Sequence, residues 1–243
     1  FSKGGQMLGE SNSSFYVDDL REIAIEVFDG GDGQFNANDH ILFHSPGPHA
    51  WVPESGPTPF SFRKNLYSDS AYYYLSIGGV GKRIPTQVAS GSSGTIIDRF
   101  YDRKVYELDS VNLLSSGQQW FGDELAQAPG KSLVKDLPFN FPNFIAGGLA
   151  ILRSSVLARS TGSGSRFDLR LNGQDIGQQT IPPVGTNQYD PFAIARTDVF
   201  TTSITSFTLD IRYQYQPGAF GAQGWLDRIE VFVPRTLSMA GIK

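Results

Sequence analysis

The side chains with the clearest chemical potential lie in a short acidic segment near the start of the 243-residue chain. Asp29, Asp32, Asn36 and Asp39 are interspersed there with glycines. Calcium is a hard cation that takes several oxygen ligands, and a glycine at a sharp bend lets a short loop wrap the ion. With Asp32 at the fifth place of an EF-hand-type loop, Gly33 falls at the sixth place and Asp39 at the twelfth. The segment therefore predicts a calcium site that uses these four oxygen-bearing side chains.

A metal-free interpretation of the same segment stays open. The first and third places of the calcium loop would be Phe28 and Gly30, which offer no side-chain oxygen. Asp and Asn side chains also accept hydrogen bonds from nearby backbone amides, and glycine supplies positive φ, so these residues form a tight connection without an ion. The interpretation that we favour is this metal-free turn, which follows the strand ending at Phe28.

The three histidines of the chain, His40, His44 and His49, form a second candidate group. Imidazole is a common zinc ligand. Their spacing, however, matches no helical pair of ligands, and residues 45–48 between the last two read as an irregular loop. We therefore expect solvated histidines rather than a metal centre.

The sequence gives only weak signals for a catalytic serine or for a catalytic pair of carboxylates. The Ser/Gly-rich runs at residues 90–94 and 161–165 do not spell the G-x-S-x-G motif and do not follow a strand-turn-helix pattern, so they predict flexible loops. Asp123 and Glu124 are adjacent carboxylates, but a glycosidase pair is defined by a separation in space that sequence does not supply. An independent hydrolase is the weakest of the functions considered.

Aromatic residues supply the main alternative function. Trp51, Trp120 and Trp225, together with Tyr72, Tyr73 and Tyr74, could form a platform for sugar rings, as in a carbohydrate-binding β-sandwich module. The interpretation that we favour is that they are core residues, and that residues 72–75 form a strand buried on both faces.

Strand-like alternation dominates the chain. Apolar residues occupy every second position at 207–215, 167–171, 229–233 and 23–27, which favours half-buried strands and conflicts with a helical period. Asn172-Gly173 after one of these runs suits a two-residue type I′ hairpin turn, because both positions need positive φ.

These patterns predict an all-β protein of two β-sandwich, jelly-roll-like domains with few short helices, and short helical turns near residues 111–115. A chain of 243 residues is long enough for two cores. Its 27 glycines and 14 prolines favour an all-β fold with many turns. We place the domains at residues 1–108 and 133–243, with a connecting stretch at 109–132. About seven strands are expected after Leu133, whereas the first domain has few strands and is expected to be incomplete by itself.

Composition excludes several functions. The formal net charge of −4 argues against nucleic acid as a partner, because phosphate neutralisation needs a basic face. No apolar run has the length of a transmembrane helix. The chain has no cysteine, so it has neither a disulfide framework nor a thiolate nucleophile of its own.

Four segments together resemble the N-terminal region of the PorU family. They are residues 16–39, which include the Asp29 to Asp39 loop, and residues 64–75, 109–122 and 224–231. Members of this family are gingipain-like cysteine endopeptidases and sortases of the type IX secretion system, on the outer face of the outer membrane. The resemblance covers nearly the whole chain, with the segments in the expected order.

The resemblance implies an exported cell-surface protein that removes the C-terminal signal of secreted cargo. In that family the catalytic His and Cys lie in a gingipain-type domain downstream of this region, so neither His40, His44 nor His49 inherits a catalytic role. The expected function is a non-catalytic region that packs on its own downstream peptidase domain, shapes access to it, or docks outer-membrane proteins of the secretion system. No cofactor is expected apart from the calcium ion.

Overall fold

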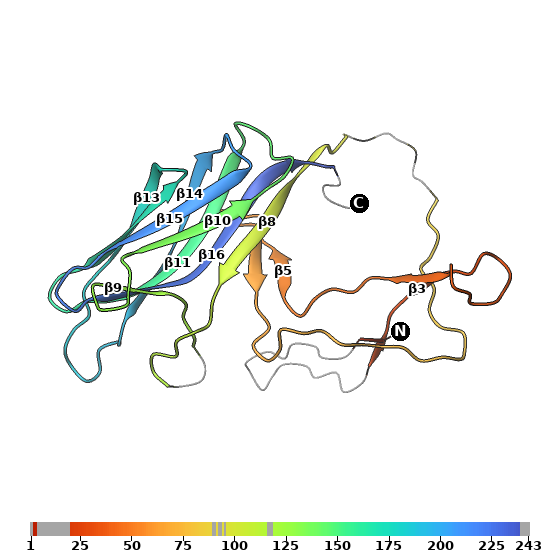
Figure 1. Ribbon diagram of the computed structural model, residues 1–243, viewed down its shortest axis with the longest axis horizontal. Helices are drawn as coiled ribbons and strands as arrows, with labels where there is room; N and C mark the ends of the chain where they lie inside the picture. The colour runs from red at the N-terminus through yellow and green to blue at the C-terminus, as the bar shows by residue number, and fades with distance from the viewer. Residues whose placement is uncertain are drawn as a thin grey trace. The chain divides into compact units, whose positions relative to one another are not determined.

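Figure 1 shows the computed structural model of the chain, which describes residues 2–3, 20–88, 91, 94, 96–115 and 119–238. The described residues contain strands and turns but no helix, which confirms the all-β fold class. Of the helical turns expected near residues 111–115, the structure has one hydrogen-bonded turn and no helix. Val111 forms an isolated bridge with Phe121, and Ser115 closes a turn by donating its amide hydrogen to Asn112 O, at an N···O distance of 3.4 Å.

Several expectations concern residues outside the described ranges. They include the start of the resembling segment at residues 16–19, the middle of another at 116–118, and Ser90, Ser92 and Ser93. No helix in the described part of the chain is long and apolar enough to cross a membrane.

The strands are short in the first part of the chain and long in the second. In order they are β1 (Ser2–Lys3), β2 (Arg21–Glu22), β3 (Ile25–Phe28), β4 (His40–Phe43), β5 (Ala50–Pro53), β6 (Phe60–Arg63), β7 (Tyr73–Tyr74), β8 (Arg99–Glu107), β9 (Glu124–Ala126), β10 (Val134–Asn140), β11 (Leu149–Arg159), β12 (Ser165–Leu171), β13 (Gln174–Ile181), β14 (Ile194–Ser203), β15 (Thr208–Gln216) and β16 (Gln223–Thr236).

The chain divides into two compact units. Unit 1 comprises Phe1–Val52 and Phe62–Gly94, and unit 2 comprises Pro53–Ser61 and Thr95–Lys243. This division differs from the expected domain boundary at residue 108. Strand β8 belongs to unit 2 because it pairs along its whole length with β16, and the connecting stretch contributes β9 to the same sheet.

Unit 2 is a sandwich of two antiparallel sheets (Figure 1). One sheet has four strands in the order β10-β15-β12-β13, and the other has the order β14-β11-β16-β8 with β9 added beside β16. Seven strands, β10 to β16, follow Leu133, as the sequence predicted. The inward side chains of both sheets form one apolar core.

The alternation in the sequence explains which side chains enter that core. Leu209, Ile211, Tyr213 and Tyr215 of β15 are fully buried, whereas Phe207 precedes the strand and is exposed. The apolar positions of β12 and the 229–233 run of β16 are also buried. A strand places successive side chains on opposite faces, so the period of two alone selects these residues.

The predicted hairpin turn is confirmed. Asn172 and Gly173 have φ values of 48° and 83°, and Leu171 pairs directly with Gln174 across the two-residue loop. The Asn172 side chain also accepts the amide hydrogen of Asp210 at 2.8 Å, which fixes the turn against β15. This local geometry sets the register of β12 and β13.

Polar contacts close both open sides of the sandwich. On one side, Asp123 accepts hydrogen bonds from Tyr106 OH at 2.5 Å and from Lys135 Nζ at 2.8 Å, and so joins β8 to β10. On the other side, Arg196 of β14 donates to Thr180 O of β13 at 2.9 Å. Each contact links an edge strand of one sheet to an edge strand of the other.

Unit 1 contains only short sheets in its described residues. These are the three-stranded sheet β2-β1-β7 and the two-stranded sheet β3-β4. Strands β5 and β6 form a further two-stranded sheet, of which Pro53, Phe60 and Ser61 are counted in unit 2. The expected buried strand at residues 72–75 is wrong. Strand β7 has two residues, and the side chains of Tyr72, Tyr74 and Leu75 are exposed.

Candidate functional site

The four predicted calcium ligands lie in one loop between β3 and β4. Asp29 accepts the amide hydrogen of Gly31 at 3.0 Å, and Asp32 accepts that of Gln34 at 2.9 Å. Asn36 donates its side-chain amide to Asp32 at 3.0 Å, and its backbone amide hydrogen to Asp39. The loop thus brings the four residues together in the manner of an Asx-stabilised turn.

Metal binding at this loop stays a prediction. Within the described ranges, no group of three or more His, Cys, Asp or Glu side chains is arranged to hold a metal ion. An ion between Asp29 and Asp39 would therefore need the Asn36 side chain and backbone carbonyl oxygens among its ligands, which calcium accepts.

The three histidines occupy different surroundings, and His44 is exposed. The His40 ring stacks on Phe28, with ring centroids 4.5 Å apart. His49 accepts the amide hydrogen of Asn65 at 3.0 Å, and its other ring nitrogen lies 3.5 Å from a carboxylate oxygen of Asp69. These contacts assign structural roles to the two rings.

The serine-rich and paired-carboxylate candidates are also engaged in structural contacts. Ser163 hydrogen-bonds to Gly218 O, and Ser165 is the first residue of β12 rather than a loop residue, with its hydroxyl 2.8 Å from that of buried Tyr215. Asp123 belongs to the Tyr106–Lys135 contact, and Glu124 pairs with Lys131 at 2.8 Å. Adjacent in sequence, the two carboxylates have different partners.

The three tryptophans differ in exposure, and the prediction of a core position is wrong for Trp120. Trp225 is only 1% exposed, which confirms it as a core residue. Trp51 packs on Phe62 with ring centroids 5.1 Å apart, and Trp120 is 46% exposed.

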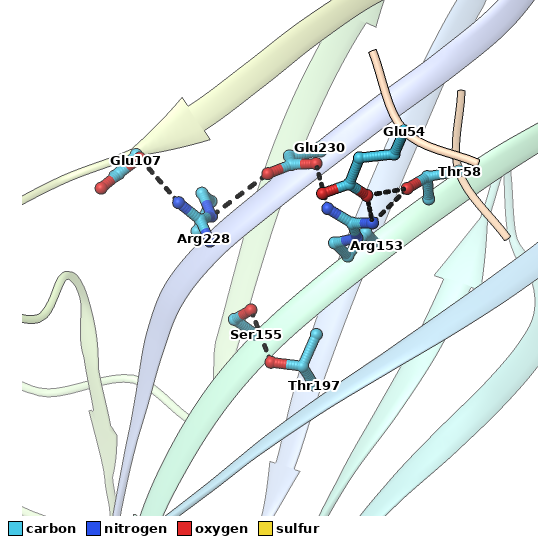
Figure 2. Close-up of polar contacts among 8 residues, drawn as sticks. All are labelled: Glu54, Thr58, Glu107, Arg153, Ser155, Thr197, Arg228 and Glu230. Carbon is cyan, nitrogen blue, oxygen red and sulfur yellow. Dashed lines mark hydrogen bonds and ion pairs between the residues drawn. The ribbon is translucent and has the colours of Figure 1, made fainter. Parts of the chain in front are cut away.

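The feature that the sequence analysis missed is a charged network on the outer face of the five-stranded sheet (Figure 2). Strand register builds it, because Arg153 of β11 lies opposite Glu230 of β16, and Arg228 of β16 lies opposite Glu107 of β8. Beside it, the hydroxyls of Ser155 and Thr197 are 2.9 Å apart. In the sequence, the only sign of this network is the presence of single charged residues within the apolar runs of β11 and β16.

Glu230 is the centre of this network. Its side chain is fully buried, and its two carboxylate oxygens lie 3.4 Å from nitrogens of Arg153 and of Arg228. Arg228 in turn lies 3.6 Å from Glu107. A buried carboxylate is costly unless it is paired, so the two arginines are what permit Glu230 to occupy this position.

The segment Pro53–Ser61, which we name the strap, completes the network (Figure 2). The Arg153 guanidinium donates to the Glu54 carboxylate and to the Thr58 hydroxyl. The hydrogen bond from Arg153 holds the pKa of Glu54 below its ordinary value. The strap is thereby attached to β11 by charge-assisted hydrogen bonds.

Asp227 lies at the β-bulge where the register of β16 against β11 shifts. The pKa of Asp227 is raised to about 6, chiefly by burial; Arg228 opposes the rise, and the carboxylates of Glu107 and Asp109 add to it.

The fold of unit 2 defines a class, the antiparallel β-sandwich modules. No family model matches the chain, and no curated protein matches its sequence. Among solved structures, the chain is similar to dimeric latent PorU from Porphyromonas gingivalis, with a TM-score of 0.78 and 24% sequence identity. The similarity covers 99% of this chain and 22% of that PorU chain. The chain therefore has the fold of a segment of PorU.

A carbohydrate-binding module of family 36, solved with calcium and xylotriose, gives a TM-score of 0.34 at 14% identity, over 56% of this chain and 99% of that chain. That score is too low to indicate a common fold.

Proposed function

We propose that this chain is the non-catalytic β region of a cell-surface, gingipain-type cysteine endopeptidase and sortase of the type IX secretion system. The observation that carries the proposal is the likeness to PorU over 99% of the chain at a TM-score of 0.78. The absence of cysteine agrees with it, because a thiol peptidase needs a thiolate that this segment does not contain.

The partners in this proposal are the peptidase domain of the same polypeptide and outer-membrane proteins of the secretion system. The parent protein would process the C-terminal signal of secreted cargo at the outer face of the outer membrane. The chain corresponds to 22% of that PorU chain, and in this proposal the peptidase domain lies in the remainder of the parent.

A supporting role suits the chemistry of the described residues. The charged side chains of the sandwich are largely engaged with one another, as in the Arg153–Glu230 and Asp123–Lys135 pairs. Such pairs fix the positions of strands and loops. A rigid sandwich of this kind can hold a neighbouring domain in a constant orientation.

The test compares the purified 243-residue protein with the full product of its gene. Both are incubated with a peptide that carries a C-terminal secretion signal, with and without iodoacetamide. We expect cleavage only by the longer polypeptide, and we expect iodoacetamide to abolish it because the reagent blocks thiols. Cleavage by the 243-residue protein alone, or a gene product without a Cys-containing peptidase domain, would overturn the proposal.

A further inference from the structure

The strap is the tip of the β5–β6 hairpin, because Pro53 ends β5 and Phe60 begins β6. It contains three prolines, which lack an amide hydrogen, and beyond the strand ladder Glu54 N donates a backbone hydrogen bond to Pro59 O at 3.1 Å. The Thr58 hydroxyl adds a bond to Glu54 at 3.3 Å. Its position therefore depends on what it contacts in the sandwich.

Contacts with the sheet are made by side chains. Arg153 donates to both Glu54 and Thr58, and the Arg103 guanidinium lies 4.1 Å above the centre of the Phe60 ring. Thr58 is only 1% exposed as a result. Strands β5 and β6 pair with each other and, among the described strands, with no strand of the five-stranded sheet. Detaching the strap as an intact hairpin tip would thus break no ladder of the five-stranded sheet.

Arg153 is held ready for this contact by a residue outside the strap. Buried Glu230 lies 3.4 Å from Arg153 Nη1, while Nη2 is the nitrogen that bonds the strap. An arginine whose planar guanidinium is already oriented by one partner loses less side-chain entropy when it binds a second partner. The same guanidinium therefore joins a fixed site in the sheet to a detachable segment.

We infer that the strap is a latch that closes on Arg153 and can open as a unit while the sandwich stays folded. Opening exposes the Arg153 guanidinium and the Phe60 ring, so the strap controls access to the outer face of the five-stranded sheet. Val52 and Phe62, on either side of the strap, belong to unit 1, so the chain crosses between units at both ends of the latch.

The absence of natural cysteine allows a direct measurement of opening. Thr58→Cys places a single thiol at the buried point of the strap, and its rate of alkylation reports how often the strap opens. Thr58→Cys itself removes the hydroxyl that accepts from Arg153, so the bond from Arg153 to Glu54 is the one left to hold the strap. Arg153→Gln in this background should raise the alkylation rate about tenfold or more, because that charge-assisted hydrogen bond is lost. Arg212→Gln is the matched control, since Arg212 pairs with Asp136 on the other sheet, and it should leave the rate unchanged.

Hydrogen exchange of β12 and β15 amides, recorded on the same variants, shows whether the sandwich remains folded. If Arg153→Gln unfolds the sandwich, Glu54→Gln decides, because it weakens the strap contact and leaves Arg153 paired with Glu230. Faster alkylation with intact protection of β12 and β15 in either variant supports the latch. The inference is overturned if alkylation stays slow in both variants, or if it rises in Glu54→Gln only together with loss of protection in the sandwich.

Discussion

The hydroxyl of Tyr213 donates a 2.7 Å hydrogen bond to Ser154 Oγ in the middle of the sandwich, and so joins β15 of one sheet to β11 of the other. Ser154 Oγ is in turn 2.6 Å from Gln179 Oε1, to which it donates. All three side chains are fully buried. Because water does not reach them, these polar groups depend on one another for hydrogen bonds.

Removal of the Ser154 hydroxyl, which lies between the other two groups, should therefore lower the free energy of unfolding more than removal of the Tyr213 hydroxyl. Ser154→Ala leaves the Tyr213 hydroxyl and Gln179 Oε1 without that partner, and we expect a loss of about 1–3 kcal/mol in the free energy of unfolding. Tyr213→Phe removes one donor and should cost about 1 kcal/mol. Urea denaturation measures both, with Tyr189→Phe as control because Tyr189 is 90% exposed. Equal effects of Ser154→Ala and the control would contradict the interpretation.

The buried carboxylate of Glu230 supplies a second prediction. Glu230→Gln leaves two arginines at a buried site without their shared counter-charge, and breaking such a pair costs about 3–5 kcal/mol. Asp136→Asn is the matched control, because it breaks the exposed pair with Arg212, and exposed pairs contribute little to stability. Urea denaturation of the two variants should separate them clearly, and similar midpoints would show that Glu230 is not the centre of the network.

Much of the sandwich could be predicted from alternation alone. The inward residues of β12, β15 and β16 follow from a period of two, and the turn at Asn172-Gly173 follows from the need for positive φ. The assignment of β8 to unit 2 could not be predicted, because its partner β16 is more than a hundred residues away in sequence. A pattern within one strand carries no information about which strand lies beside it.

The charged network was missed for a related reason. Arg153 and Glu230 each interrupt an apolar run, but only the register of β11 against β16 shows that they face each other. The Tyr72 to Leu75 run shows the opposite error. Four consecutive large side chains suggested a buried strand. In the structure only Tyr73 and Tyr74 form a strand, and Tyr72, Tyr74 and Leu75 are exposed. Composition indicated burial where tertiary packing did not supply it.

The raised pKa of Asp227 makes the free energy of unfolding depend on pH. Burial, with the nearby carboxylates of Glu107 and Asp109, raises its pKa from 3.8 to about 6. The folded state thus binds the proton more tightly than the unfolded state, so stability should fall as the pH rises between these two values and level off above them. Asp227→Asn should be more stable than the natural protein at about pH 8 and no more stable at about pH 4. NMR titration of the Asp227 carboxyl checks the cause directly, and a midpoint at the ordinary aspartate value would refute it.

Calcium binding by the loop between β3 and β4 is the remaining prediction. Asp29, Asp32 and Asp39 already accept hydrogen bonds from loop amides, but each carboxylate has about four lone-pair sites, so acceptor capacity is left for an ion. We expect added calcium to raise the melting temperature, because a ligand that binds only the folded state stabilises it. Asp39→Asn should abolish the rise, whereas Asp69→Asn, at an exposed aspartate of the same unit, should retain it. No heat in calorimetric titration and no change in melting temperature would leave the loop as a metal-free turn held by its own side chains.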